Sequence, residues 1–450
     1  MTLIRVPRAA RRRALLALPA AAALAFAAAC SSSGGGTPAA ANTADALTTP
    51  VTLTFWSWTP AAAPTVKLFE KQYPNIKINL VNAGQSAAEY TKLADAEKGG
   101  TGAPDVAQIE YFALPQFVLS KQVVNLDDYG AASLQSKYSA SAWSQVSING
   151  GIYGYPQDTG PMVMFYRKDI FTSLGLTVPT TWDQFEADAV KIHQANPADY
   201  ITSIDPSDAG GMDSLIWAAG GTPFKTSNST DVTTNLSDPG AQKVATLWTN
   251  MLQQHLVDPT AGWTTDWWSG MGSGEFATWI TGAWAPGSIG STIPQTDSDW
   301  AVAPIPQWTA GADVTSQNGG SSDAVMATSQ HKAAAAAFAQ WLNTNPTATE
   351  SLTQNGLFPA TNALLNSQSF LDAPVTALDG QAANKIFVDA SEHVAPGWQY
   401  LPYQVYANSV YGDTVGQAET AGTSVMTGLE SWQSQIDSYG TTQGFTVTKG

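Results

Sequence analysis

The stretch VTLTFWSWTPAAAPTVKLFEKQYPNIKINL, residues 51–80, decides the fold class of this chain. Apolar side chains alternate with threonine over residues 51–55, as in a strand with one buried face, and alternation returns over residues 76–80. Between these two segments, apolar and aromatic residues recur at helical spacing over residues 66–73. A strand, a helix and a second strand in this order form a unit with two parallel strands. The sequence therefore predicts an α/β fold.

The same alternation of strands and helices continues downstream. A helix is predicted over residues 87–98, followed by a glycine-rich break and a strand over residues 105–109. The segment Thr180–Asp183 has the spacing of a helix start with a capping box. Residues 333–342 are typical of a further helix. The chain contains no repeat of fixed period and no heptad pattern, so solenoids and coiled coils are not expected.

Residues 1–29 predict an export signal. Five arginines precede the apolar residues 14–29, which have the length of a signal-peptide core and are too few for a membrane span. This segment runs into Cys30, the only cysteine, through three alanines that resemble a bacterial lipobox. We therefore expect a lipid on Cys30 and a flexible tether over residues 30–49, which places the protein on the outer face of the cytoplasmic membrane. A plain secretory signal with an incidental cysteine is the alternative, and the pair Arg12-Arg13 leaves the twin-arginine export route open.

The charge of the chain excludes several classes of partner. Loss of the five N-terminal arginines leaves 15 basic residues against 36 acidic ones, a formal net charge of −21. Such an acidic protein is not expected to bind nucleic acid or an anionic lipid surface. Arg167 is then the only arginine, so a bidentate clamp on a phosphate or carboxylate is not expected. A neutral or cationic ligand fits the composition better.

Several short motifs, in order along residues 50–440, resemble the extracellular solute-binding proteins of the carbohydrate-import type, the family that includes maltose-binding protein. They are Leu53–Trp58, Phe69–Pro74, Gly102–Val106, Tyr153–Pro156, Phe165–Asp169, Pro179–Trp182, Gly274–Ala277, Gly282–Trp284 and Ala303–Pro306. The chain departs from the family at residues 282–284, where proline often precedes the tryptophan, and in the tryptophan-rich stretch 263–268. These departures leave the identity of the sugar open.

The resemblance implies two discontinuous α/β lobes around a hinge, the type II periplasmic-binding-protein fold, with a ligand buried between the lobes. We expect residues 50–157 and 304–346 in the first lobe and residues 158–303 and 347–442 in the second. The resemblance also implies capture of a sugar by lobe closure and its delivery to the permease subunits of an ABC-type importer. A monomer is expected.

A sugar site needs flat aromatic rings for the C–H faces of the ligand and carboxylate or amide groups for its hydroxyls. All 16 tryptophans follow the predicted signal. Open α/β sheets bind ligands at the carboxyl ends of their strands, where several of these side chains fall. The predicted ligand-binding residues are Trp58, Glu110, Tyr111, Asp158, Asp208, Trp268, Trp284, Gly319, Gly320 and Tyr403.

The candidate residues lie at different places relative to the predicted strands and lobe crossings. Trp58 and the pair Glu110 and Tyr111 directly follow predicted strands, whereas Asp158 lies at the expected first crossing between lobes. Trp284 matches the tryptophan that stacks on sugar in the family, as the resemblance implies. Gly319 and Gly320 permit a close approach of backbone to ligand. For each residue a structural role in the core, a turn or a loop is the alternative.

Catalytic signatures are missing from the chain. It has no Gly-x-Ser-x-Gly, no P-loop and no His-Glu-x-x-His, and its four histidines are widely spaced. We therefore expect no catalytic residue, no metal and no cofactor. A ligand such as a polyamine, a peptide or a polyol on the same fold remains an alternative. A secreted glycoside hydrolase is a further one, because 36 acidic residues include many possible carboxylate pairs, although no (β/α)₈ repeat is visible.

Overall fold

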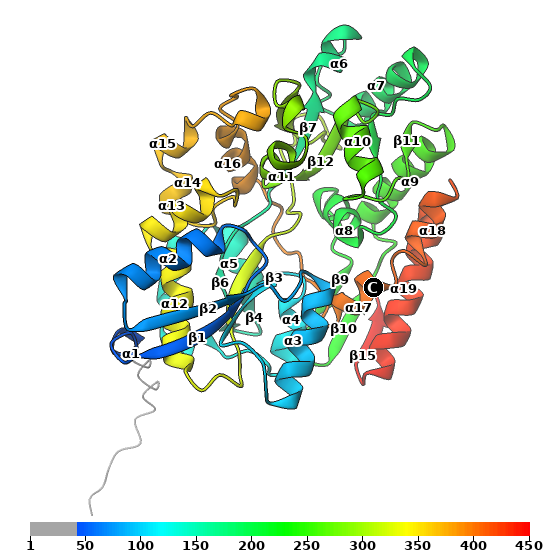
Figure 1. Ribbon diagram of the computed structural model, residues 1–450. Coiled ribbons are helices and arrows are strands. Elements are labelled where there is room, and N and C mark those ends of the chain that lie inside the picture. The colour runs from blue at the N-terminus through cyan, green and yellow to red at the C-terminus, as the bar shows by residue number, and fades with distance from the viewer. Residues whose placement is uncertain (1–42) are drawn as a thin grey trace, which may run out of the picture. The chain divides into compact units, whose positions relative to one another are not determined.

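A five-stranded sheet forms the first lobe in the computed structural model, which describes residues 43–450 (Figure 1). Its strand order is β2 (Ile76–Val81), β1 (Val51–Trp56), β3 (Val106–Glu110), β14 (Ser321–Val325) and β6 (Tyr155–Pro156). Strand β1 runs parallel to β2 and β3, whereas β14 runs antiparallel to β3. The strand–helix–strand unit predicted from residues 51–80 is confirmed, with α2 (Ala62–Gln72) as its helix.

The other elements predicted from the sequence also form. They are α3 (Ala87–Gly99), β3, α7 (Trp182–Ala195) and α12 (Lys332–Thr344). The predicted helix start is confirmed at α7, but its cap lies one residue later than the Thr180–Asp183 spacing indicated: the Thr181 side chain accepts from the backbone N–H of Gln184 at 3.3 Å, and the Gln184 side chain accepts from the N–H of Thr180 at 2.8 Å. The backbone N–H of Gln184 in the first turn and that of Thr180 before the helix are thereby satisfied.

Aromatic packing holds the first lobe together. Helices α2, α12 and α13 (Pro346–Gln354) pack against one another beside the sheet. The fully buried rings of Phe55 and Phe69 meet that of Phe338 with centroids 5.4 and 4.8 Å apart. Burial of such rings contributes on the order of 2–3 kcal/mol each. The remaining elements of this lobe are α1 (Thr43–Ala46), α4 (Leu114–Leu119), α5 (Ala140–Val146), β4 (Ser147–Ile148), β5 (Gly151–Ile152) and the 3-10 helices η1 (Leu126–Tyr129) and η2 (Ala131–Lys137).

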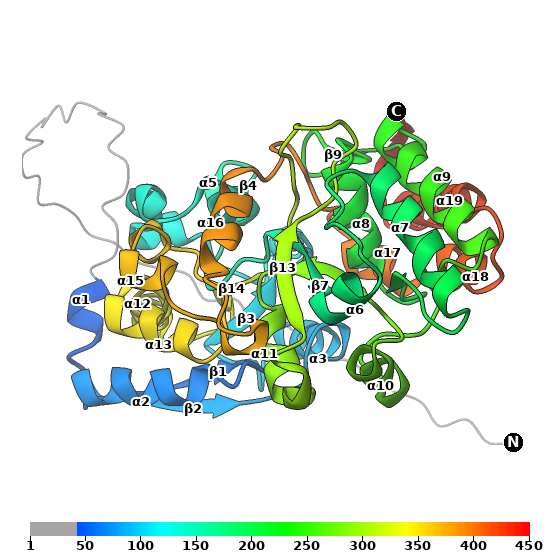
Figure 2. The ribbon, with the colours of Figure 1, turned by 90° about the horizontal axis from the view of Figure 1, so that it is seen from above.

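The second lobe is built around a three-stranded antiparallel sheet. Strand β7 (Met162–Arg167) lies between β12 (Thr278–Gly282) and β13 (Trp300–Pro304), as Figure 2 shows for β7 and β13. The helices of this part are α6 (Lys168–Ser173), α7, α8 (Ala209–Ala218), α9 (Pro239–Gln253), α10 (Thr265–Ser273), α11 (Ala285–Thr292), α14 (Asn362–Leu365), α15 (Gln368–Leu371) and α16 (Asn384–Glu392). Short strands β8 (Thr202–Ser203) and β11 (Val257–Asp258) form a parallel pair beside them.

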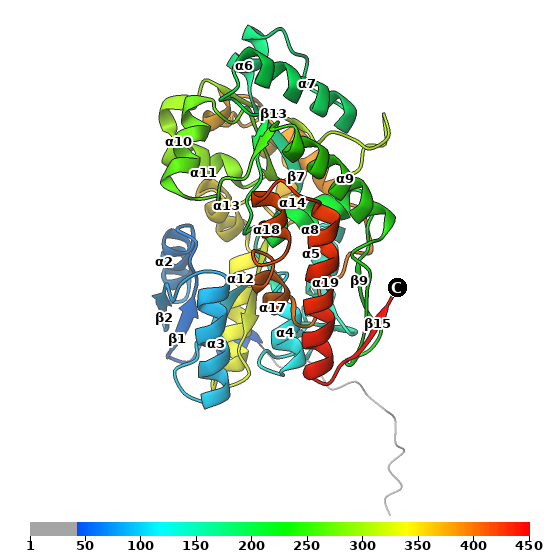
Figure 3. The same ribbon diagram turned by 90° about the vertical axis from the view of Figure 1, so that its right-hand side faces the viewer.

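The C-terminal segment packs on the second lobe. It comprises α17 (Gln404–Ser409), α18 (Val415–Thr420), α19 (Val425–Thr442) and β15 (Thr446–Lys449), which pairs with β10 (Asp231–Thr234), itself paired with β9 (Phe224–Thr226). Helix α19 lies alongside α9 (Figure 3). The fully buried Trp432 of α19 donates its indole N–H to the carbonyl oxygen of Ala407 at 2.7 Å, which ties α19 to α17.

Three chain segments cross between the lobes side by side. Residues 157–161 link β6 to β7, residues 318–320 lead into β14, and a third segment passes through Pro359. Asp158 forms a bridge with Pro359, and the N–H of Asn318 donates to the carbonyl oxygen of Gly160 at 2.8 Å. These crossings form a narrow hinge, the arrangement that permits lobe closure.

The observed lobe boundaries differ from the expected ones in three places, one of which is the C-terminal end, where the second lobe extends past residue 442 to include β15. Residues 305–317 stay with the second lobe because their backbone bonds to it, as between the N–H of Gln307 and the oxygen of Thr180 at 2.9 Å. The chain does not leave the first lobe at residue 347, because Ala348 and Leu352 are buried in its core. Residues 305–317 are polar and lack periodicity, so no pattern marked the true crossing.

The predicted export signal and Cys30 lie outside the described residues. Within residues 43–450, no helix is long and apolar enough to cross a membrane.

Candidate ligand-binding cleft

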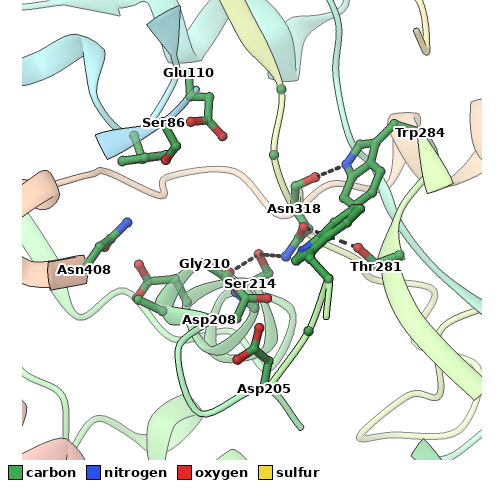
Figure 4. A pocket seen from close by; sticks show the side chains of 18 of the residues that line it. Ser86, Glu110, Asp205, Asp208, Gly210, Ser214, Thr281, Trp284, Asn318 and Asn408 are labelled. Atoms are coloured by element: carbon green, nitrogen blue, oxygen red, sulfur yellow. Dashed lines mark hydrogen bonds between the residues drawn. The ribbon is translucent and has the colours of Figure 1, made fainter. Parts of the chain in front are cut away.

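A cleft of about 950 Å³ lies between the two lobes and next to the hinge. Its size is at the upper end of what small-molecule sites offer, roughly 300–1,000 Å³. In Figure 4, Glu110 and Ser86 on the first-lobe side face Asp208 and Asn408 across the open space, while Trp284 and Asn318 close one end. Both lobes therefore supply polar and aromatic groups to one cavity.

Eight of the ten residues predicted from the sequence line this cleft. They are Trp58, Glu110, Tyr111, Asp158, Asp208, Trp284, Gly319 and Gly320. Most of them sit where a strand ends: Glu110 is the last residue of β3, and Trp58 and Trp284 follow β1 and β12 by two residues. The rule that places ligands at carboxyl ends of strands explains why these residues lie together, and their contact with a ligand stays a prediction.

Trp268 and Tyr403 do not line the cleft. Trp268 is adjacent to Trp267 on α10, so the two rings point in different directions, and it is Trp267 that reaches the cleft wall. The ring of Tyr403 is buried against Phe445 and Tyr439, at centroid distances of 5.0 and 5.7 Å. Tyr400, three residues earlier, occupies the cleft instead.

Glu110 is the main polar group of the first-lobe wall. Its carboxylate accepts a hydrogen bond from the Tyr90 hydroxyl at 2.9 Å, and burial raises its pKa to about 7. Glu89 lies behind it, fully buried, and no residue of the described chain bonds to either of its oxygens. Burial and the nearby Glu110 raise the pKa of Glu89 to about 8. Carboxyl groups in this wall thus change charge near neutral pH.

Asp158 and Tyr111 support the hinge side of the cleft. One carboxylate oxygen of Asp158 accepts from the N–H of Ser321 at 2.9 Å, and its main-chain oxygen accepts from the Tyr111 hydroxyl at 2.8 Å. Both side chains are more than nine-tenths buried, and burial raises the pKa of Asp158 to about 7. These hydrogen bonds join the segments that cross between the lobes, so the two side chains have fewer donors and acceptors left for a ligand.

Gly319 and Gly320 are required by packing. Both have left-handed backbone, with φ of +78° and +99°, which suits glycine. A Cβ on Gly320 would lie 2.7 Å from the ring of Tyr111, and one on Gly319 would lie 3.0 Å from the indole nitrogen of Trp284. We expected these glycines to let the backbone approach a ligand closely. In the structure they let the backbone approach the rings of Trp284 and Tyr111.

Asp208 begins the second-lobe wall as the N-cap of α8. Its carboxylate accepts from the N–H of Gly211 at 2.9 Å, and a Cβ on Gly211 would lie 2.6 Å from the other oxygen. Deeper in this wall, Asp213 and Glu419 are buried, and each has one oxygen without a hydrogen-bond partner among the described residues. Burial raises the pKa of Glu419 to about 8.

A group of tryptophan rings forms the aromatic end of the cleft. Trp284 is half-buried, and its indole N–H donates to the carbonyl oxygen of Asn318 at 2.8 Å. Trp279 meets it edge-on at 5.7 Å, and Trp263 stacks on it at 5.8 Å with ring planes 26° apart. The site prediction missed Trp263 and Trp279, although the unusual density of tryptophan over residues 263–268 was a signal for the first of them.

The charge of the cleft is one-sided. Its lining includes six acidic side chains and no lysine, arginine or histidine among the described residues; the acidic members are Glu110, Asp158, Asp205, Asp208, Asp213 and Glu419. Arg167, the arginine that follows the predicted signal, lies outside the cleft and pairs with Asp169 at 2.7 Å. An anionic ligand would be repelled here, whereas a neutral, hydroxyl-rich or cationic ligand is accommodated.

Two α/β lobes that meet at a hinge and enclose a ligand-sized cleft define a solute-binding protein of the type II periplasmic kind, and the predicted fold class is thereby confirmed. Residues 49–349 match the family of bacterial extracellular solute-binding proteins, and the chain belongs to this family.

Two solved structures illustrate the similarity. One is the ABC-transporter-associated binding protein of B. animalis subsp. lactis Bl-04 in complex with β-1,6-galactobiose, 37% identical, with a TM-score of 0.81 over 89% of this chain and 100% of that one. The other is the galacto-N-biose-/lacto-N-biose I-binding protein of Bifidobacterium longum in complex with lacto-N-biose, 26% identical, with a TM-score of 0.78 over 89% and 99% of the two chains.

A third relative comes from sequence comparison. The lactose-binding protein of Rhizobium radiobacter is 24% identical over 293 residues, which cover 62% of this chain and 67% of that protein.

Proposed function

We propose that this chain captures a neutral sugar in the cleft between its lobes and delivers it to the permease of an ABC-type importer. The observation that carries this proposal is the composition of the cleft: a tryptophan surface at Trp284 combined with several acidic side chains and, within residues 43–450, no cationic side chain in the lining. Indole faces suit the C–H surfaces of a sugar ring, and carboxylates accept hydrogen bonds from its hydroxyls. The 37% identical relative in complex with β-1,6-galactobiose supports the sugar class.

The proposed mechanism is capture by closure. Glu110 on the first lobe and Asp208 on the second flank the same cavity. A ligand that bonds to both lobes binds the closed form more tightly than the open form and so shifts the population toward it. The closed form is then the state that the permease recognises.

We further propose that the protein works as a monomer anchored to the outer face of the cytoplasmic membrane through a lipid on Cys30. The lipobox-like residues before Cys30 support this location. A Cys30→Ala variant should be released into the culture medium, whereas the wild type should stay with the cell envelope. Equal release of both would contradict the anchor.

The main competing ligand class is a polyamine, which the one-sided charge of the cleft favours. Peptide and polyol ligands are weaker alternatives. We propose binding without turnover, because the family consists of binding proteins; cleavage of chromogenic glycosides by the purified protein would instead favour a hydrolase.

A thermal-shift screen of the chain without residues 1–30 tests the proposal. The ligand panel contains galactose, β-1,6-galactobiose, lactose, longer oligosaccharides, spermidine and short peptides. A ligand at a hundredfold excess over its Kd stabilises the folded state by about 2.7 kcal/mol, which raises Tm by several degrees. A shift with one or more sugars supports the proposal. A shift with spermidine or peptide alone overturns the sugar assignment.

A further inference from the structure

Trp263 has an unusual position for a large apolar side chain. It lies in the loop between β11 and α10, lines the cleft, and is 57% exposed, the highest value among the exposed large hydrophobic residues of the described chain. Its backbone has φ of +64°, a left-handed conformation that bulky L residues rarely adopt. Strained backbone that persists in a fold often marks a functional position.

The neighbours of Trp263 fix this conformation from both sides. A Cβ on Gly262 would lie 2.7 Å from a carboxylate oxygen of Asp205, so the loop passes close to this side chain of the cleft wall. On the other side, Thr264 caps α10: its hydroxyl accepts from the N–H of Trp267 at 3.2 Å and donates to the carbonyl oxygen of Ala261 at 2.9 Å. The loop therefore has little freedom to turn the indole away.

The ring of Trp263 extends the aromatic surface of Trp284. The two ring planes are only 26° from parallel, and their centroids are 5.8 Å apart. A separation of 5.8 Å leaves no room for a sugar between the rings, so Trp263 covers part of one face of Trp284, and the two indoles form a stepped surface on which each ring stays partly exposed. Three further tryptophans support Trp263 from below, with centroid distances of 5.8 to 5.9 Å to Trp267, Trp268 and Trp279.

The indole N–H groups of the cleft tryptophans differ in whether they already donate a hydrogen bond within the protein. Those of Trp284 and Trp267 are engaged, donating to the oxygen of Asn318 and to the hydroxyl of Ser203, both within 2.8 Å. Among residues 43–450, none accepts a hydrogen bond from the indole nitrogen of Trp263. Trp263 thus offers both an exposed face and a free donor to a ligand.

We propose that Trp263 is a specificity-determining residue that makes this cleft select ligands of two or more sugar rings over monosaccharides. One sugar ring covers about one indole, so the second indole gains contact only when a second ring is present. The cleft volume of about 950 Å³ agrees with this, because a single hexose would leave much of it filled with water. The inference rests on the proposed sugar-binding function.

Calorimetric titration with a two-ring and a one-ring probe tests the inference. The probes are β-1,6-galactobiose and galactose, and the proteins are the wild type, Trp263→Ala, Trp263→Phe and Trp284→Ala. We expect Trp263→Ala to weaken galactobiose binding about tenfold or more and galactose binding less than twofold. Trp263→Phe should restore most of the loss, and Trp284→Ala should weaken both probes. Leu174→Ala, which removes an exposed apolar side chain outside the cleft, should bind as the wild type does.

Several outcomes overturn the inference. Equal loss of both probes in Trp263→Ala, together with a lower Tm, would mean that the ring only supports the tryptophan cluster. Tighter binding in Trp263→Ala would mean that the ring obstructs the site. If the wild type does not bind galactobiose, the sugar that gives the largest thermal shift and its own monosaccharide replace the probes. If no sugar binds the wild type, the proposed sugar-binding function is wrong and the inference falls with it. If the wild type binds sugars but Trp263→Ala weakens both probes equally, only the inference is wrong.

Discussion

The indole nitrogen of Trp284 donates a hydrogen bond to the backbone oxygen of Asn318 at 2.8 Å. Trp284 belongs to the second lobe, whereas Asn318 begins a segment that crosses between the lobes. The bond therefore fixes the ring that faces the cleft relative to the hinge. A ligand that stacks on Trp284 is placed beside the segment that moves when the lobes close.

Removal of this ring is expected to abolish most of the sugar affinity. In Trp284→Ala, Kd should rise on the order of 10- to 100-fold, because a stacking surface is lost along with the bond to Asn318. Trp284→Phe keeps an apolar ring but lacks the N–H donor, so its Kd should lie between those of the wild type and Trp284→Ala. Calorimetry with β-1,6-galactobiose measures the series. Wild-type affinity in Trp284→Ala would show that the ring does not contact the ligand.

Gly320→Ala is expected to destabilise the hinge. The added methyl group would lie 2.7 Å from the ring of Tyr111, and the backbone φ of +99° is already unfavourable for alanine. We expect the free energy of unfolding to fall by about 2–3 kcal/mol. The matched control is Gly397→Ala, where φ is +95° but nothing lies within 4 Å of the added carbon. Chemical denaturation compares them, and equal losses would refute the steric explanation.

Glu89 is expected to make the protein less stable as pH rises. Its pKa is raised from 4.5 to about 8 in the folded state, so the folded protein holds a proton that the unfolded chain releases. Stability is therefore fully retained below about pH 4.5 and decreases as pH increases through about 8. Glu89→Gln removes the titrating group and should be more stable than the wild type at pH 8.5, on the order of 2 kcal/mol.

The pH dependence of unfolding checks this prediction. At pH 5 the two proteins should have similar stability, because the wild-type carboxyl is then protonated. The exposed Glu430 provides a control, and Glu430→Gln should follow the wild type at both pH values. A constant difference between Glu89→Gln and the wild type across pH would rule out titration of Glu89 as the cause.

Sugar affinity is expected to decrease in acid. The pKa values of Glu110 and Asp158 are raised to about 7, so both groups bind protons as pH falls through the neutral range. A protonated carboxyl is a weaker acceptor for sugar hydroxyls than a carboxylate. Affinity should fall several-fold between pH 8 and pH 5 in the wild type and less in Glu110→Gln. A flat wild-type profile would show that these groups do not accept bonds from the ligand.

The sequence was most informative where a periodic pattern sets the structure. Alternation over residues 51–55 and 76–80 predicted the first strands, and the ends of such strands placed Trp58 and Glu110 in the cleft. Prediction failed where position depends on distant packing. Tyr403 and Tyr400 lie in an irregular segment, and it is packing of Tyr403 against Tyr439 and Phe445, far along the chain, that buries its ring.

The same limit applies to the tryptophan-rich stretch. Helical geometry explains why Trp267 and Trp268 face different ways, but the sequence does not say which one faces the cleft. The left-handed backbone of Trp263 could not be predicted either, because no sequence pattern shows that this loop passes close to Asp205 before the cap at Thr264.

The central claim is that the cleft binds a neutral sugar. Calorimetric titration of the wild-type chain with β-1,6-galactobiose, lactose and spermidine tests it most directly. We predict saturable one-to-one binding of at least one of the two sugars and none of spermidine. Binding of spermidine without binding of either sugar, or of any other saccharide found by the thermal-shift screen, would contradict the claim.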